Sequence, residues 1–430
     1  MKTLLMPVVA CMALGAGAQD FGKHFADSTL RLDYVFGGTA SVGGPADCTV
    51  LFDGGVRTPG WAGRRHNLDS VPLRGNGKLT LRDAETGETM YATSFSTLYQ
   101  EWLTAAEAQR RPRAFENSFL VPVPLRKAVA EVVLYDSGDG ILGRIEHEVD
   151  PADILLVDRG GVASNPHRYI HRGGDPREVI DVAILAEGYT AQETEKFYHD
   201  AGVAVEAILE HEPFRSRAGD FNFVAVAAPS IDSGVSVPRL GAWRSTAVGS
   251  NFSTFYSDRY LTTANVKRIH DCLVNIPYEH VVILANTPEY GGGGIYNFYT
   301  LTTAGHENFR PVVVHEFGHS FGGLADEYFY DDDDLATAMY RTDVEPWEQN
   351  LTTLADFPSK WQDMLAPSVT VPTPAQGASV HQVGAYEGGG YQSKGVYRPA
   401  IDCRMRTNTA KGFCPVCTRA ISRLIDFYIK

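Results

Sequence analysis

The sequence predicts an α+β protein in which an N-terminal β-sandwich domain precedes a larger domain of strands and helices. A length of 430 residues is roughly two to three times that of a common single domain, so we expect two folded units. Short apolar runs separated by glycine-rich turns extend to about residue 150, whereas longer apolar strands alternate with helical patterns beyond residue 175. We place the first domain at residues 19–160 and the second at residues 175–430.

The first domain is predicted from alternation of apolar and other side chains with a period of two. Leu30, Leu32, Tyr34 and Phe36 alternate in this way, and three further apolar runs occupy residues 119–123, 130–135 and 141–145. Turns are expected at the glycine-containing clusters 37–38, 43–45, 75–77 and 137–140. Short strands at this spacing are typical of a sandwich. Because this part contains no cluster of catalytic residue types, we expect an accessory or substrate-positioning domain.

A polar stretch at residues 164–176 is interpreted as a linker, and the pattern changes after it. Continuous apolar runs at residues 179–186, 221–227 and 280–285 predict strands covered on both faces. Thr190 and Glu193 have the spacing of a capping box, which predicts that a helix begins there. A second helix is expected around residues 263–273.

Composition and charge limit the classes of protein to which this chain can belong. Hydrophobic residues make up 44% and charged residues 21% of the chain, as in ordinary globular proteins. The net charge of −14 disfavours nucleic acids and anionic membrane surfaces as partners, because binding phosphates requires clustered Lys and Arg. After the N-terminal region, no apolar run reaches the length of a transmembrane helix. Oligomeric state has no signal in the sequence.

The N-terminus has the pattern of a secretory signal peptide over residues 1–18. A basic start, an apolar stretch and a small-residue cleavage site follow one another. Cys11 stands in a variant of a lipidation motif, but the apolar stretch before it is short and contains Pro7. We expect an exported protein of the periplasm, the cell surface or the medium.

Five cysteines remain after residue 18, and an odd number leaves at least one free thiol. They are Cys48, Cys272, Cys403, Cys414 and Cys417. Cys414 and Cys417 form a C-x-x-C pair without a second pair or histidines at zinc-finger spacing, and without a thioredoxin-like context. A disulfide from Cys403 to Cys414 or Cys417 is the expected use of these residues.

The strongest chemical signal is an H-E-x-x-H motif formed by His315, Glu316 and His319. Histidines four residues apart lie one helical turn apart on the same face, so both imidazoles can bind one metal ion. Zinc suits this pair because it accepts neutral imidazole nitrogens and lowers the pKa of a bound water to around 7. Glu316 is the candidate general base that takes a proton from this water.

A third ligand is expected just beyond the motif. Gly322 and Gly323 can end the helix and reverse the chain. The next oxygen donors are Asp326, our choice, and Glu327, the alternative, whereas position 325 is an alanine. A third ligand from a glutamate on a second long helix is the other architecture, and the glycine pair argues against it.

The segment HEFGHSFGGLADEY at residues 315–328 resembles the active-site signature of the bacterial immunoglobulin A peptidase family of zinc metallopeptidases. Supporting matches occur at residues 185–190, 229–234, 259–263, 290–297, 397–399 and 403–406. The resemblance spans most of residues 180–420 and is looser before residue 150. It implies a metzincin-like fold, zinc on His315, His319 and Asp326, Glu316 as base, and a methionine beneath the metal, matched by Met405. An immunoglobulin substrate is not implied.

Three other features are weaker. Tyr397 is a candidate donor to the developing oxyanion, although 20 tyrosines are present and most of them pack in cores. The acidic run at residues 331–334 is a candidate Ca²⁺ loop, but it lacks EF-hand ligand spacing, and a solvated loop is the alternative. The glycine run at residues 291–294 lacks the Lys of a phosphate loop; it would let a peptide approach the backbone closely, and an ordinary flexible loop is the alternative.

The sequence therefore predicts an exported zinc-dependent endopeptidase with one catalytic zinc ion and a protein or peptide substrate. The alternative is an exported module that binds a glycan or protein and has a structural or vestigial metal site. The intact Glu316 favours the enzyme, because a structural site has no use for a carboxylate beside an open coordination position. The motif also allows hydrolysis of a non-peptide amide or ester.

Overall fold

The N-terminal part of the chain forms two mainly antiparallel sheets of four strands each. The computed structural model describes residues 21–40, 46–330, 340–380 and 382–430. In one sheet the strand order is β5-β1-β2-β8, and in the other it is β4-β3-β6-β7. The bounds are β1 Phe25–Thr39, β2 Asp47–Pro59, β3 Gly77–Asp83, β4 Thr89–Phe95, β5 Arg113–Pro124, β6 Ala128–Tyr135, β7 Ile141–Val149 and β8 Val157–Asp158, with the short helices α1 Phe21–His24 and α2 Leu98–Trp102.

Aromatic side chains join the two sheets. Phe36 on β1 and Phe119 on β5 both contact Phe95 on β4, and the Phe95 and Phe119 ring centroids are 4.3 Å apart. Gly37 and Gly38 were expected to form a turn, but they lie inside β1 and pair with both neighbouring strands. The reason is close backbone approach, since a Cβ at Gly38 would lie 1.7 Å from the Asp47 carbonyl oxygen.

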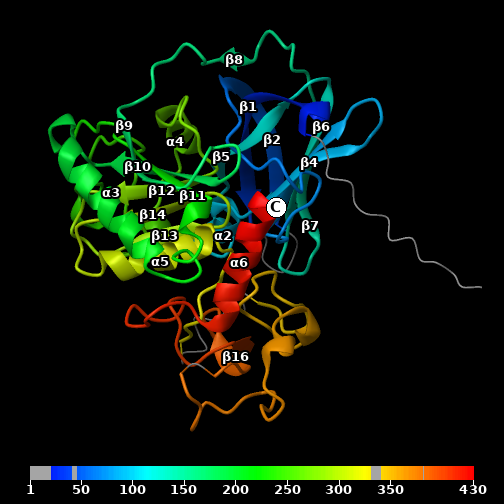
Figure 1. The fold of residues 1–430 in the computed structure, drawn as a ribbon, viewed down its shortest axis with the longest axis vertical. Coiled ribbons are helices and arrows are strands. Elements are labelled where there is room, and N and C mark those ends of the chain that lie inside the picture. The colour runs from blue at the N-terminus through cyan, green and yellow to red at the C-terminus, as the bar shows by residue number, and fades with distance from the viewer. Residues whose placement is uncertain (1–20, 41–45, 331–339, 381) are drawn as a thin grey trace, which may run out of the picture.

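The larger part of the chain is built on a six-stranded sheet of order β13-β14-β12-β10-β11-β9. The four central strands are mutually parallel, and both outer strands are antiparallel to their neighbours. Figure 1 shows this sheet in green and yellow beside the blue and cyan N-terminal strands. The bounds are β9 His167–Arg172, β10 Ile180–Glu187, β11 Phe221–Val226, β12 His280–Ala285, β13 Gly292–Ile295 and β14 Tyr299–Thr303.

The two faces of this sheet join different cores. Val182 and Ile184 on β10 belong to a core shared with helices α3 Thr194–Leu209 and α5 Phe309–Ser320. Ala183 and Leu185 point the other way, into a core that includes helix α4 Val266–Cys272 and continues into the N-terminal sheets. Both faces are therefore covered, as the continuous apolar strand sequences predict.

The C-terminal part contains the hairpin β15 Tyr386–Gly389 and β16 Gln392–Arg398, followed by helix α6 Pro415–Ile429. In Figure 1, α6 is red and runs from the side of β16 to the junction of the other two parts. Its end contacts the N-terminal part, because Asn67 Nδ2 donates to the Phe427 carbonyl oxygen at 2.8 Å. Among the described residues, no helix has the length and apolar character that crossing a bilayer requires.

Several predicted elements of the larger part are confirmed, and one differs. Strands β10, β11 and β12 occupy the three apolar runs, and the capping box of Thr190 and Glu193 is formed at the start of the α3 region. Residues 164–176 are not simply a linker, because β9 lies within them and pairs with β11 as an outer strand. An outer strand has only one neighbour, so its sequence lacks the continuous apolar run of a central strand.

Candidate functional site

Helix α5 presents the two histidines of the H-E-x-x-H motif. The helix ends at Ser320, directly after His319. Gly323 then adopts φ +57°, and the Gly323 amide donates to the His319 carbonyl oxygen. This left-handed residue reverses the chain, as expected for a glycine at a helix C-terminus. The reversal brings the next residues back toward the histidine face of the helix.

Three side chains meet on this face. His315 Nε2 and His319 Nε2 are 3.0 Å apart, and Asp326 Oδ1 lies 3.0 Å from the first and 3.3 Å from the second. The three candidate ligand atoms lie within 4.8 Å of one another. The structure therefore brings together all three residues that the sequence suggested as metal ligands.

Backbone carbonyls orient both imidazoles. His315 Nδ1 is 2.9 Å from the Arg404 carbonyl oxygen, and His319 Nδ1 is 2.6 Å from the Leu324 carbonyl oxygen. If Nδ1 donates to these oxygens, each Nε2 carries a lone pair that faces the other. Metal-binding histidines are commonly fixed in this way by a hydrogen bond from the second ring nitrogen.

The donor set fits a divalent cation. Among the described residues, Asp326 Oδ1 is buried without a hydrogen-bond partner of good geometry, and His315 Nε2 and His319 Nε2 face each other at 3.0 Å. Burial lowers the pKa of His319, but the Asp326 charge more than offsets this and raises the pKa to about 9. Burial raises the pKa of Asp326, whereas the two histidines hold it well below its usual range. Two imidazoles and a carboxylate are a common ligand set for zinc.

Met405 lies under this part of α5. It is fully buried, and a Cβ at Gly318 would lie 2.6 Å from its Sδ. The Met405 carbonyl oxygen accepts from the Glu327 amide at 2.8 Å. Gly318 is therefore required for Met405 to approach the helix between the two histidines.

Glu316 is placed beside the outer strand β13. A Cβ at Gly292 would lie 2.9 Å from Glu316 Oε1, and a Cβ at Gly294 would lie 2.9 Å from the His319 Cβ. Burial raises the pKa of the Glu316 carboxyl, and the positive charge of the histidines opposes this only in part. The missing side chain of Gly292 leaves the space in which the Glu316 carboxylate lies, and that of Gly294 lets β13 approach the α5 backbone.

Glu327 points away from the histidines. Its Oε1 is 3.1 Å from Cys417 Sγ, and its carboxylate groups with Cys403, Cys414 and Cys417. The disulfide expected for these cysteines is not formed, since Cys403 Sγ and Cys417 Sγ are 3.8 Å apart and a disulfide needs about 2.05 Å.

The tyrosine that reaches the three-residue cluster is Tyr391, which donates to Asp326 Oδ2 through its hydroxyl group. Tyr397 lies on β16, exchanges backbone hydrogen bonds with Thr352 and packs against the core around α5 and α6. Tyr391 follows a run of three glycines, and sequence reasoning had no signal that distinguished it from the other tyrosines.

The N-terminal part contributes a carboxylate that the sequence did not reveal. Glu101 on α2 accepts a hydrogen bond from the hydroxyl of Tyr260. Burial raises the pKa of Glu101 to about 7, and the charges of His319 and Glu316 reach it. The first part of the chain therefore lies within electrostatic range of the site.

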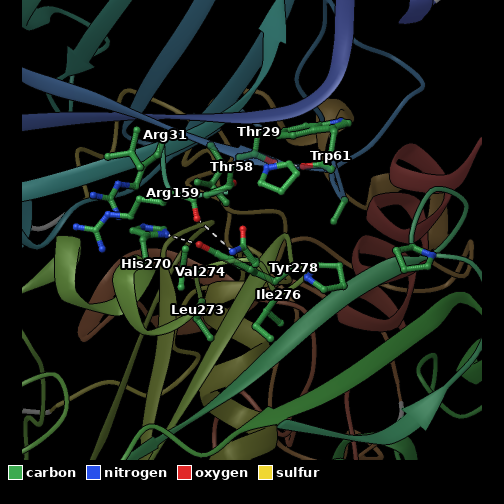
Figure 2. Close-up of a pocket in the computed structure, with 18 of the residues that line it drawn as sticks. Thr29, Arg31, Thr58, Trp61, Arg159, His270, Leu273, Val274, Ile276 and Tyr278 are labelled. Atoms are coloured by element: carbon green, nitrogen blue, oxygen red, sulfur yellow. Dashed lines mark hydrogen bonds between the residues drawn. The ribbon is translucent and has the colours of Figure 1, made fainter. Parts of the chain in front are cut away.

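A separate cavity of about 410 Å³ lies between the N-terminal strands and the α4 region (Figure 2). Its lining includes Thr29, Arg31, Trp61 and His270, and His270 Nδ1 is 2.7 Å from the Tyr278 hydroxyl. None of its lining residues belongs to the histidine and aspartate cluster. The expected signal peptide with Cys11 and the acidic run at 331–334 lie outside the described residues.

Comparison with known families agrees with this geometry. A model described as IgA Peptidase M64 matches residues 169–380 and 375–425, and one described as Peptidase M64 N-terminus matches residues 20–142. No curated protein matches the chain. The first model covers more than half of the sequence and includes the whole cluster, which confirms the resemblance seen in residues 315–328. The chain belongs to the IgA peptidase M64 family of peptidases.

Proposed function

We propose that this chain is an exported, zinc-dependent endopeptidase of the periplasm, the cell surface or the medium. The observation that carries the proposal is the convergence of His315 Nε2, His319 Nε2 and Asp326 Oδ1 around one point. The family supports peptide bonds as the substrate class. We further propose a metzincin-like catalytic domain and a sandwich arrangement of the two N-terminal sheets.

In this proposal, His315, His319 and Asp326 would hold the zinc ion. A zinc ion held there would polarise a carbonyl and lower the pKa of the attacking water. Glu316 takes the proton from this water and passes it to the leaving amine, which restores the carboxylate.

The glycine strand β13 would position the substrate next to Glu316. Gly292 and Gly294 bring the backbone of β13 against α5, and Tyr260 forms a single bridge with Gly292 from the other side. An extended peptide beside this strand would present its carbonyl groups near the proposed base. The immunoglobulin A in the family description is not part of this proposal, because nothing in the site identifies a particular protein target.

Chelator-sensitive cleavage tests the proposal. Wild-type protein is incubated with a mixed peptide library, with and without a chelator and after zinc is restored. We expect cleavage that the chelator abolishes and zinc restores. Glu316→Gln should lose roughly 10²- to 10⁴-fold in activity, the usual contribution of a general base, while its zinc content stays at the wild-type level.

Glu307→Gln is the matched control, because Glu307 is exposed just before α5 and should leave activity unchanged. His319→Ala should lose one equivalent of zinc relative to wild type. Cleavage of esters or non-peptide amides alone would replace the peptidase with another hydrolase. Stoichiometric metal without any hydrolysis would favour the alternative of a binding module.

A further inference from the structure

A second cluster of metal-binding residue types lies on the far side of the segment that carries Asp326. Glu327, Cys403, Cys414 and Cys417 are all buried, and one ligand atom from each lies within 4.8 Å of the others. They come from three separate places in the sequence: the turn after α5, the loop after β16, and the start of α6. Such convergence in a buried place requires a chemical reason, since ionisable groups are seldom fully buried unless they are paired.

A disulfide would satisfy only half of this cluster. Joining Cys403 to Cys417 would leave the thiol of Cys414 outside the bond, and the Glu327 carboxylate would keep the Asn350 amide on Oε1 but gain nothing on Oε2. The Glu327 Oε2 atom is fully buried and has no hydrogen-bond partner among the described residues, and an uncompensated buried polar atom destabilises a fold. A cation bound between the four side chains would satisfy every member at once.

The separation of Cys403 and Cys417 matches an edge of a tetrahedral site. Sulfur ligands of zinc lie at about 2.3 Å, so two of them are about 3.8 Å apart across a tetrahedron. Cys403 Sγ and Cys417 Sγ are 3.8 Å apart, and Cys417 Sγ is 3.1 Å from Glu327 Oε1. The Cys414 amide donates to Cys403 Sγ at 3.2 Å, and the Cys417 amide donates to Cys414 Sγ at 3.5 Å. Amide donors of this kind stabilise the thiolate form that binds metal.

We propose that Cys403, Cys414, Cys417 and Glu327 bind a second zinc ion, in a closed structural site distinct from the histidine site. Three thiolates select soft or borderline metals, and a carboxylate oxygen is compatible with zinc. Four protein ligands leave no open position, so this ion has no role in hydrolysis.

The cysteine site stabilises the histidine site through residues that neighbour both. Glu327 follows Asp326 directly, and Asn350 Nδ2 donates to both Glu327 Oε1 and the Ala325 carbonyl oxygen. Cys403 precedes Arg404, whose carbonyl oxygen contacts His315 Nδ1. An ion held by Glu327 and Cys403 therefore fixes two segments that orient the histidine site, and it ties both to α6.

Metal content and a cobalt spectrum test this proposal independently of activity. We expect two zinc ions per wild-type chain by elemental analysis, and one in His319→Ala. With Co²⁺ in place of zinc, wild type and His319→Ala should both show the thiolate-to-cobalt charge-transfer band. Cys417→Ser should lose one zinc ion and most of this band. Cys48→Ser and Cys272→Ser are the controls, because these cysteines lie outside the cluster and should keep both ions and the band.

A variant of a buried cysteine can fail to fold, so the deciding samples are wild type and His319→Ala. The absence of a thiolate-to-cobalt band in both would overturn the proposal, as would a Cys403 to Cys417 disulfide found by mass spectrometry of the wild-type protein. Iron or copper in place of the second zinc would also overturn it. These readouts do not depend on hydrolysis, so a failure of the peptidase assay leaves them interpretable.

Discussion

Replacing Gly292 with alanine tests the position of Glu316 without altering a proposed metal ligand. The new Cβ would lie 2.9 Å from Glu316 Oε1, 3.1 Å from Cγ and 3.2 Å from Cδ. Comfortable contacts between such atoms are about 3.5–4.0 Å, so the carboxylate must move by about 0.5 Å. The end of a glutamate side chain can yield by a rotation that costs about 0.5–1.5 kcal/mol.

The same displacement has a larger effect on catalysis. A misplacement of about 1 Å in a reacting group costs roughly 100-fold in rate, so about half that distance predicts a loss of roughly 10-fold in kcat/KM. Stability should change by no more than about 1 kcal/mol, because alanine also restricts the unfolded chain and offsets part of the strain. We therefore expect slower hydrolysis of a peptide substrate with wild-type zinc content and a nearly unchanged Tm.

Gly202→Ala provides the matched control. Gly202 lies in α3, and a Cβ there meets no atom within 4 Å. The substitution should raise stability by about 0.5–1 kcal/mol and leave kcat/KM unchanged. If Gly292→Ala hydrolyses peptides at the wild-type rate while keeping its zinc, Glu316 does not act from the position described, and the assignment of the base is refuted.

Two further predictions concern buried carboxyls. Glu101→Gln should keep its metal and remove the ionisation near pH 7 from the pH profile of kcat/KM, because burial raises the pKa of Glu101 to about 7 within range of the site; a profile identical to wild type would exclude this role. Burial also raises the pKa of Asp181 to about 7, so the folded state binds its proton more tightly than the unfolded chain, and stability falls as pH rises from about 4 to 7. Asp181→Asn should keep the acceptor for Asn222 Nδ2 and gain stability over wild type at pH 8 but not at pH 4, as measured by urea unfolding; an equal difference at both pH values would contradict the shift.

The buried strands and capped helix were predictable because local pattern alone determines them. β10 and β12 are continuous apolar runs, and the capping box at Thr190 is readable from two residues. Elements governed by distant contacts were not predictable. Gly37 and Gly38 form part of β1 because β2 passes too close for a side chain, and β9 is recognisable only through its pairing with β11.

For the candidate site, sequence spacing predicted the residues that helix α5 and the turn after it bring together. One helical turn brings His315 and His319 together, and the glycine turn after the helix brings Asp326 to them. Both features are set by residues close in the sequence. Tyr391 and Glu101 come from other parts of the chain and have no motif, so only the folded structure brings them to the site. Tyr397 was a candidate donor to the oxyanion, and in the structure Tyr391 is a tyrosine that donates to the Asp326 carboxylate.

Asp326 and Glu327 follow the glycine turn, and both were candidates for the third metal ligand. Successive side chains on an extended segment project to opposite sides. Asp326 Oδ1 faces the histidines, and Glu327 Oε1 faces the cysteines. If both clusters bind zinc, the peptide bond between these residues spans two metal sites, and a shift of either ion moves the ligand of the other. The position of Asp326 then depends on α6 and Cys403, so the C-terminal helix stabilises the hydrolytic site although it supplies no residue to it.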